Sequence, residues 1–209
     1  MGKKKIITHN KIHDSKIRLD EEKYNETFLQ SLNLDFDVDQ YDGITINNHE
    51  SDSTPYMMVW LSNVDRLFKM IVDKINLNEY HFCDVGCGLG LLTIYVESKY
   101  QFKSYEGFDY NTQLINKANR IVSLLDLKNK LIFEKADANV KQLEEKPYVL
   151  FMFNPFGTKT LQNFIQNNLM TLKRNQMVIL YANDLWINDF KDYKTIHRDD
   201  YYNLSAIFF

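Results

Sequence analysis

From about residue 80 onward, short apolar runs alternate with stretches in which apolar residues recur at every third or fourth position. The first pattern predicts strands and the second predicts helices. The run at 148–153 is apolar throughout, which is typical of a strand buried on both faces of a parallel sheet. The predicted strands are 80–85, 102–108, 131–135, 148–153 and 177–181, and the predicted helices are 89–99, 112–125, 160–172, a weak one at 140–144 and a short one at 185–190. Two last apolar segments, 193–197 and 203–209, flank the charged turn at 198–200 and predict an antiparallel pair of strands.

The first part of the chain has a different pattern. Residues 1–19 lack sustained periodicity, whereas 20–34 place Tyr24, Phe28 and Leu32 at helical spacing. Asp-Gly at 42–43, inside the partly alternating stretch 34–46, predicts a β-hairpin. Pro55 precedes a second helical pattern, 56–75. We therefore expect an N-terminal tail and a small α+β lobe over 1–54, and a larger α/β domain over 55–209.

A glycine-rich stretch directly follows the strand at 80–85. Asp84 lies near the end of that strand, and Gly86, Gly88 and Gly90 follow at every second position. Glycine suits a strand-to-helix turn because it adopts positive φ and lets a ligand approach the backbone. A dinucleotide-binding fingerprint would need a glycine at the sixth position of the motif, where this chain has Leu91.

The observed form, acid-x-Gly-x-Gly-x-Gly, resembles the first motif of the class I S-adenosylmethionine-dependent methyltransferases. The resemblance covers roughly residues 55–209, where the order of strands with a closing hairpin is also that of the family. It implies a Rossmann-like methyltransferase fold: a doubly wound, mostly parallel seven-stranded sheet with an antiparallel last strand. It also implies S-adenosylmethionine as cofactor and S-adenosylhomocysteine as product.

The same resemblance implies the cofactor-binding residues. The glycine turn would hold the methionine part of the cofactor. Asp109, about 20 residues further on at the next strand end, would accept hydrogen bonds from the ribose hydroxyls, and Asp137 with Ala138 would face the adenine. The full predicted set is Asp84, Gly86, Cys87, Gly88, Gly90, Asp109, Tyr110, Asp137, Ala138 and Asn154.

The strand at 148–153 ends in Asn154-Pro155-Phe156-Gly157. Amino-methylating members of the family have Asn/Asp-Pro-Pro-aromatic here and bind a planar amino group with it. This chain departs from that motif at its third and fourth positions, so we expect a turn at the pocket rim, with Pro155 and Phe156 contacting substrate. We expect Tyr56, where the N-terminal lobe enters the main domain, to line the same pocket.

No residue is singled out as the catalytic group. A hydroxyl acceptor would need its proton removed, and Asn154, Tyr56 and His197 are the candidates for a catalytic role, with Asp184 and His49 as further possible bases. The two cysteines, Cys83 and Cys87, fit free thiols in a cytoplasmic protein. No clustered His or Cys completes a metal site around them, so we expect no metal.

Charge and hydropathy bear on partners and location. Residues 24–54 carry seven acids and no Lys or Arg, although 1–18 carry six Lys and Arg. Since nucleic-acid enzymes place a basic face beside the pocket, this distribution does not favour nucleic acid as a partner. No apolar run approaches the ~18 residues of a membrane span, and the oligomeric state is left open.

Three functional hypotheses follow. The favoured one is a cytoplasmic methyltransferase acting on a small molecule or a saccharide or lipid precursor, with oxygen as the acceptor atom. The second is an N-methyltransferase of adenine in nucleic acid or of a protein side chain, supported by Asn154-Pro155 and the basic N-terminus. The third is a non-catalytic binding partner with the methyltransferase fold, against which the intact glycine motif counts.

Overall fold

The structure is a computed structural model that describes residues 15–34, 52–190 and 195–209. Its centre is a seven-stranded sheet with the order β3-β2-β1-β4-β5-β7-β6. Every neighbouring pair from β3 to β5 is parallel, and β7 is antiparallel to both β5 and β6. The predicted fold class is therefore confirmed. The strands are β1 (His81–Val85), β2 (Tyr105–Asp109), β3 (Leu131–Lys135), β4 (Tyr148–Phe153), β5 (Val178–Ala182), β6 (Thr195–Asp199) and β7 (Leu204–Phe208).

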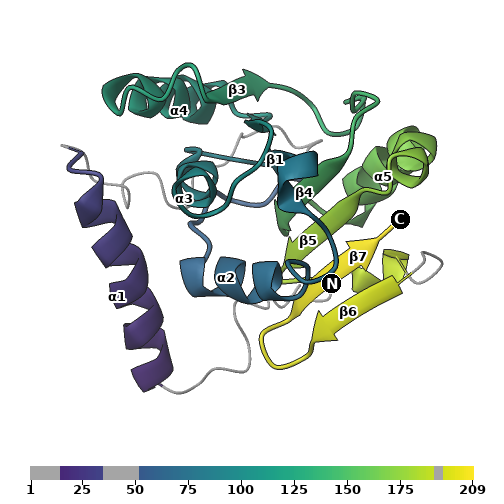
Figure 1. The fold of residues 1–209 in the computed structure, drawn as a ribbon, viewed down its shortest axis with the longest axis horizontal. Helices are drawn as coiled ribbons and strands as arrows, with labels where there is room; N and C mark the ends of the chain where they lie inside the picture. The colour runs from purple at the N-terminus through teal and green to yellow at the C-terminus, as the bar shows by residue number, and fades with distance from the viewer. Residues whose placement is uncertain (1–14, 35–51, 191–194) are drawn as a thin grey trace, which may run out of the picture.

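Helices cover both faces of this sheet (Figure 1). Alternate residues of β4 point to opposite faces, so that Val149 and Phe151 join one apolar cluster while Leu150 and Met152 join another. The first cluster is closed by α2 (Leu61–Lys69), α3 (Leu91–Lys99) and α4 (Thr112–Leu124), and the second by α5 (Thr158–Arg174) and the short 3₁₀ helix η3 (Ile187–Phe190). A second 3₁₀ helix, η2 (Leu77–Glu79), precedes β1.

The first helix, α1 (Ser15–Ser31), stands beside this layered domain (Figure 1). Asn25 of α1 donates to the carbonyl of Val59 (2.9 Å) and accepts from the N–H of Leu61 (2.9 Å). The side chain of Trp60, the residue at the N-terminal cap of α2, makes no capping hydrogen bond. Asn25 of α1 therefore caps the N-terminus of α2. These bonds hold α1 against the segment that enters α2.

A second contact of α1 centres on the carboxylate of Asp65 in α2. The carboxylate accepts hydrogen bonds from three tyrosine hydroxyls and one ammonium group, on Tyr24 (2.9 Å), Tyr95 (2.9 Å), Tyr100 (3.0 Å) and Lys99 (2.6 Å). Burial acts to raise the pKa of Asp65, but these four hydrogen bonds outweigh it and hold that pKa below its ordinary value. This cluster joins α1, α2 and α3.

The structure corrects three details of the predicted elements. The helix expected over 56–75 is confined to α2, because 53–60 run extended across the edge of the sheet and residues after Lys69 form turns. The weak helix expected at 140–144 is absent: 138–140 form a turn, and 141–144 have no regular secondary structure. The first helix begins at Ser15, earlier than expected. The predicted hairpin at 34–46 lies almost wholly outside the described residues. Among the helices that the structure describes, none is long and apolar enough to cross a membrane.

Candidate active site

The candidate site lies where the parallel strands end. Three adjacent central strands, β1, β4 and β5, each run into a residue with positive φ: Gly86 (79°), Asn154 (42°) and Asn183 (53°). Glycine and asparagine tolerate this conformation better than other residues. The chain therefore turns sharply off all three strands at one edge, which is where ligands bind in doubly wound sheets.

The glycine turn brings together three parts of the chain. A Cβ on Gly86 would lie 2.5 Å from Pro155, one on Gly88 would lie 2.3 Å from the ring of Tyr56, and one on Gly90 would lie 2.4 Å from the ring of Phe133. All three glycines also have positive φ, at 79°, 52° and 71°. Glycine is thus required at all three positions, both by the backbone conformation and by the close contacts.

Two carboxylates on neighbouring strands flank this turn. Asp109, at the end of β2, accepts from the N–H of Gly88 (2.9 Å) through one oxygen and from the N–H of Asn111 (2.7 Å) through the other. Each oxygen keeps a lone pair for a further donor, such as a ribose hydroxyl. Burial raises the pKa of Asp109, and these backbone N–H groups partly offset the rise.

Asp84 lies deeper, on β1, with only 4% of its surface exposed. The hydroxyl of Thr93 donates to its carboxylate (3.2 Å). Burial is the main reason that its pKa rises to about 7; the bond from Thr93 opposes the rise, and the nearby Asp109 adds to it. A cationic group bound beside Asp84 would favour the ionised form.

The remaining predicted cofactor residues lie along the same edge. The N–H of Ala136 donates to the carbonyl of Asp109 (3.1 Å), which holds the turn after β3 beside the end of β2. In that turn Asp137 accepts from the backbone N–H of Asn139 (2.9 Å) and Ala138 is buried. Tyr110 is 37% exposed.

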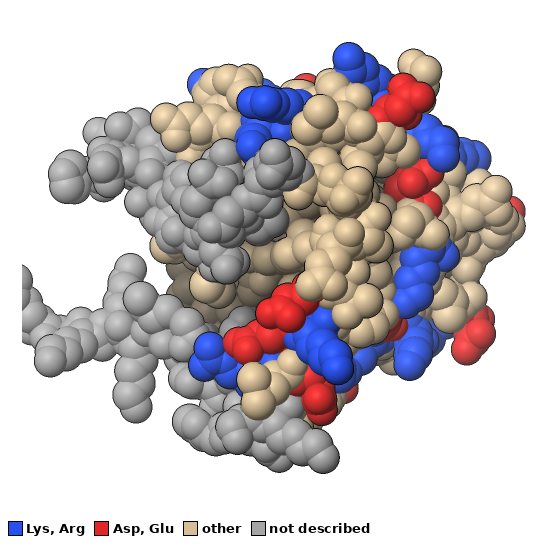
Figure 2. All heavy atoms as spheres, turned by 90° about the vertical axis from the view of Figure 1, so that its left-hand side faces the viewer, with Lys and Arg blue, Asp and Glu red and all other residues tan. Residues whose placement is uncertain are grey.

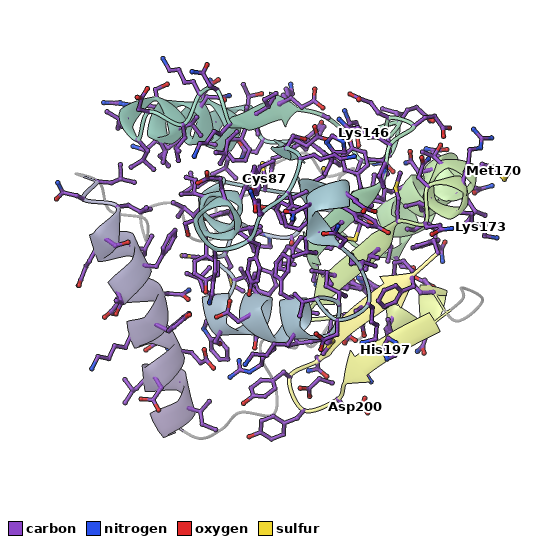
Figure 3. All side chains as sticks on the ribbon, in the orientation of Figure 1. Cys87, Lys146, Met170, Lys173, His197 and Asp200 are labelled. Carbon is purple, nitrogen blue, oxygen red and sulfur yellow. The ribbon has the colours of Figure 1, made fainter. Side chains whose placement is uncertain are left out.

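Both cysteines are free and buried, and burial raises the pKa of each thiol. Figure 3 labels Cys87 near the middle of the sheet, beside α3. Within the described ranges, no group of three or more His, Cys, Asp or Glu side chains could hold a metal ion.

On the other side of the glycine turn, a short segment at 52–54 is bound to the loop that follows β4. The N–H of Thr54 donates to the carbonyl of Pro155 (3.0 Å), and its hydroxyl donates to the carbonyl of Asn154 (2.9 Å). Ser53 forms a β-bridge with Phe156. We call residues 52–56 the strap, because they cross the loop after β4 and carry Tyr56 onto Gly88.

The strap is also attached to the start of α5. The carbonyl of Asp52 accepts from the N–H of Gly157 (2.9 Å), and its carboxylate accepts from the N–H (3.3 Å) and the hydroxyl of Thr160. Since Gly157 at the cap of α5 has no side chain, Asp52 performs the capping role. Sequence reasoning missed Asp52 and Thr54 as contributors to the site, because nothing near them in the chain indicates partners about 100 residues away.

The predicted substrate-contacting residues separate into two groups. Tyr56 and Pro155 lie against the glycine turn. Phe156 is 7% exposed, and its ring packs near Phe164 of α5 inside the second apolar cluster. Its place in the structure is thus that of a core residue.

Two of the candidate bases, His197 and Asp184, do not lie against the glycine turn. His197 is in the middle of β6, at the far edge of the sheet, where it packs against Phe208 (Figure 3). Asp184 is 2% exposed and forms an ion pair with Arg198 (2.7 Å). His49 lies outside the described residues. Of the catalytic candidates, the structure brings only Asn154 and Tyr56 to the glycine turn.

The model of the methyltransferase small domain family matches residues 61–198, and the chain belongs to that family. Its methyl donor is therefore S-adenosylmethionine, with S-adenosylhomocysteine as product. The residues described above fit such a ligand, because Asp109 is bonded to the glycine turn and keeps acceptor capacity for hydroxyl groups. A comparison with curated proteins found no match.

Solved structures with a similar fold include two tRNA methyltransferases and a ribosomal protein methylase. The ribosomal protein L11 methylase of Lactobacillus delbrueckii subsp. bulgaricus is 15% identical, with a TM-score of 0.47, over 69% of this chain and 76% of that one. The tRNA m1A22 methyltransferase TrmK of B. subtilis is 13% identical, with a TM-score of 0.46, over 68% of this chain and 64% of that one. TrmK of M. capricolum, solved with S-adenosylhomocysteine, is 17% identical, with a TM-score of 0.44, over 73% of this chain and 68% of that one.

These comparisons correct the predicted partners. We expected a small-molecule, glycan or lipid-precursor acceptor and did not favour nucleic acid, whereas the similar solved structures include methyltransferases of tRNA and of a ribosomal protein. The acidic composition of 24–54 was the basis of that expectation, and most of this segment lies outside the described residues. On the face shown in Figure 2, Lys and Arg alternate with Asp and Glu, and neither sign forms a separate patch.

Proposed function

We propose that this protein transfers the methyl group of S-adenosylmethionine to an acceptor held at the loop after β4. The observation that carries the proposal is the contact between Pro155 and Gly86, where an added Cβ would lie 2.5 Å from the proline ring. This contact places the acceptor loop directly against the turn that would bind the methionine part of the cofactor. Donor and acceptor would then meet at one point of the sheet edge.

Each element of the site has a role in this proposal. The glycine turn binds the methionine part, Asp109 holds the ribose, and Asp137 with Ala138 borders the adenine. Tyr56 covers the turn from the strap. When bound, S-adenosylmethionine supplies an electrophilic methyl group whose leaving group is neutral, so the protein has to position the acceptor rather than protonate a leaving group.

The non-catalytic alternative has less support. A protein that kept only the fold would not need a buried Asp84 beside three glycines at positive φ, because burial of that carboxylate makes its ionised form unfavourable in the absence of a bound cation. Their retention together supports cofactor binding in this chain.

Transfer of tritium from S-[methyl-³H]adenosylmethionine to bulk bacterial tRNA and, separately, to ribosomal proteins tests the proposal. We expect labelling of one of these acceptors by the parent protein and a loss of at least about tenfold in Asp109→Asn, which keeps the size of the side chain but weakens its hydrogen bonds with ribose. Asp73→Asn, an exposed position after α2, is the matched control. Labelling of neither acceptor, by protein that binds S-adenosylhomocysteine, would contradict a macromolecular acceptor. Failure to bind S-adenosylhomocysteine would contradict the whole proposal.

A further inference from the structure

The backbone acceptors of the loop after β4 are already engaged. The carbonyls of Asn154 and Pro155 accept from the hydroxyl (2.9 Å) and the N–H (3.0 Å) of Thr54. An amino group of a substrate would need such acceptors, because each N–H of an amine must find one when it is withdrawn from water. Thr54 therefore takes one lone pair of each backbone oxygen that an amine-binding loop would offer, and a substrate amine would have to share these oxygens with it.

The side-chain oxygen of Asn154 is bonded within the protein. The Tyr181 hydroxyl donates to Oδ1 of Asn154 (3.1 Å). The hydroxyl of Tyr181 has a single proton, and it is directed at Oδ1 of Asn154. The nearby backbone N–H of Trp186 acts to lower the pKa of Tyr181. Burial raises the pKa of Tyr181, which keeps that proton in place. In the structure, Oδ1 of Asn154 is thus the amide atom that faces the Tyr181 hydroxyl.

The free group of Asn154 is then its amide nitrogen. Nδ2 makes no hydrogen bond with any described residue, although only 8% of Asn154 is exposed. A second unpaired donor lies in the loop that follows β5: Nε1 of Trp186 is the one fully enclosed side-chain nitrogen or oxygen without a partner in the described part of the chain. Asn154 is bonded to the Tyr181 hydroxyl, and the backbone of Trp186 lies near the same hydroxyl.

We propose that this loop recognises its substrate by donating hydrogen bonds, so that the group bound at Asn154 is a carbonyl oxygen, a carboxylate oxygen or an aromatic ring nitrogen, and not an amino group. Tyr181 is the positioning residue that keeps the amide in this orientation, and Thr54 competes with a substrate amine for the backbone acceptors. The inference rests on the proposed function, since it describes the acceptor half of the same site.

The chemistry of transfer agrees with this assignment. An acceptor atom without a proton uses its lone pair to form the bond to the methyl carbon, while the carbon–sulfur bond breaks and its electron pair stays on sulfur. No proton then has to be removed. The two candidate bases His197 and Asp184 are, respectively, at the far edge of the sheet and paired with Arg198, and such a reaction does not require them.

Two flat probes of similar size distinguish donation from acceptance. The first, 1-methyl-2-pyridone, has a carbonyl and no N–H, and the second, aniline, has an amino group and no oxygen. Each is titrated into ¹⁵N-labelled protein saturated with S-adenosylhomocysteine, and the side-chain amide signal of Asn154, assigned by its loss in Asn154→Asp, reports binding. We expect the pyridone to bind at least about tenfold more tightly than aniline.

Two variants test the assignment of the amide. Asn154→Asp keeps the bond from Tyr181 but replaces the free donor with an acceptor, so the preference between the probes should reverse, as judged from the indole signal of Trp186. Tyr181→Phe should reduce the preference without changing the affinity for S-adenosylhomocysteine, and it serves if Asn154→Asp does not fold. Equal binding of the probes, a preference for aniline or no response to either would overturn the inference. Failure of the parent to bind S-adenosylhomocysteine would instead count against the proposed function.

Discussion

The two halves of the candidate site are built in different ways. In the cofactor half, the bonds join residues close in the chain, with Thr93 9 positions from Asp84 and Asp109 21 positions from Gly88. In the acceptor half, Thr54 bonds to a loop 100 positions away and Asp52 to a helix 108 positions away. The first half is therefore encoded locally, and the second depends on the packing of the strap against the finished domain.

The halves meet at the glycine turn, where Tyr56 and Pro155 take the space of absent side chains. A change in the cofactor half should alter ligand affinity directly. A change in the strap should act first on local stability, because its bonds hold backbone to backbone. Four expected effects follow in order of decreasing size, and the third of them lies outside both halves.

The largest expected effect concerns Asp84 and pH. Because its pKa is raised to about 7 in the folded protein, its neutral form contributes stability that is fully present below about pH 4 and is lost as pH rises through 7. The full effect is of the order of 4 kcal/mol. Asp84→Asn should thus gain stability relative to the parent between pH 5 and 8, measured by urea unfolding at each pH. An equal difference between the two proteins at all pH values would contradict the burial of an ionisable Asp84.

The second effect concerns a change from glycine to alanine, made once in each half of the site. Gly88→Ala forces an alanine to φ 52° and places its Cβ 2.3 Å from the Tyr56 ring. We expect a loss of about 100-fold in affinity for S-adenosylhomocysteine, equivalent to ~3 kcal/mol, with partial recovery in Gly88→Ala/Tyr56→Ala.

Gly157→Ala is the matched change in the acceptor half. Gly157 has an ordinary φ of −77°, and an added Cβ would meet only the carboxylate of Asp52, at 2.7 Å. Its affinity for S-adenosylhomocysteine, measured by calorimetry, should stay within about threefold of the parent. Equal losses in the two alanine variants would remove the distinction between the halves.

The third effect concerns Asp65, which lies outside both halves of the site. Asp65→Ala removes the common partner of three tyrosines and Lys99, so it should cost ~2–3 kcal/mol of stability. Tyr24→Phe removes one of these bonds and should cost ~1 kcal/mol. Urea unfolding measures both, and neither should change the affinity for S-adenosylhomocysteine. A large loss of affinity in Asp65→Ala would show that α1 acts on the site.

The smallest effect concerns Asp52. Asp52→Ala removes the cap of α5 and should cost ~1 kcal/mol of stability. Thr160→Val, which keeps the backbone N–H but removes the hydroxyl, should cost less. Thermal unfolding of the two variants measures the difference. Stability equal to the parent in Asp52→Ala would mean that the strap is not attached to α5 in solution.

The fold was largely predictable, because a buried parallel strand appears in the sequence as an apolar run, and an amphipathic helix appears as apolar residues at every third or fourth position. The strands at 131–135 and 148–153 have the predicted bounds. The non-helical path of residues 54–60 was not predictable, because distant groups hold it against a helical pattern: Pro155 accepts from Thr54, and Asn25 donates to Val59. Likewise Glu134, which has no evident reason in the sequence, pairs with Lys141 across a turn.

The candidate site was predictable only in its cofactor half. Gly86, Gly88 and Asp109 carry a spacing that has a physical meaning by itself. The sequence does not indicate whether Asn154 donates or accepts a hydrogen bond at the site, because this depends on Tyr181 and Thr54, which approach from other elements. The burial of Phe156 under α5 is a similar case, since an exposed rim and a buried turn have the same sequence pattern.

The central claim is that the edge formed by the glycine turn and Asp109 binds S-adenosylmethionine. Thermal unfolding of the parent and of Asp109→Ala, with and without S-adenosylhomocysteine at about 100 times the dissociation constant measured for the parent, tests it most directly. Binding should stabilise the parent by about 2.7 kcal/mol, which corresponds to a rise of roughly 5–10 °C, and Asp109→Ala should show little rise. No rise in a parent protein that unfolds cooperatively, at any ligand concentration, would contradict the claim.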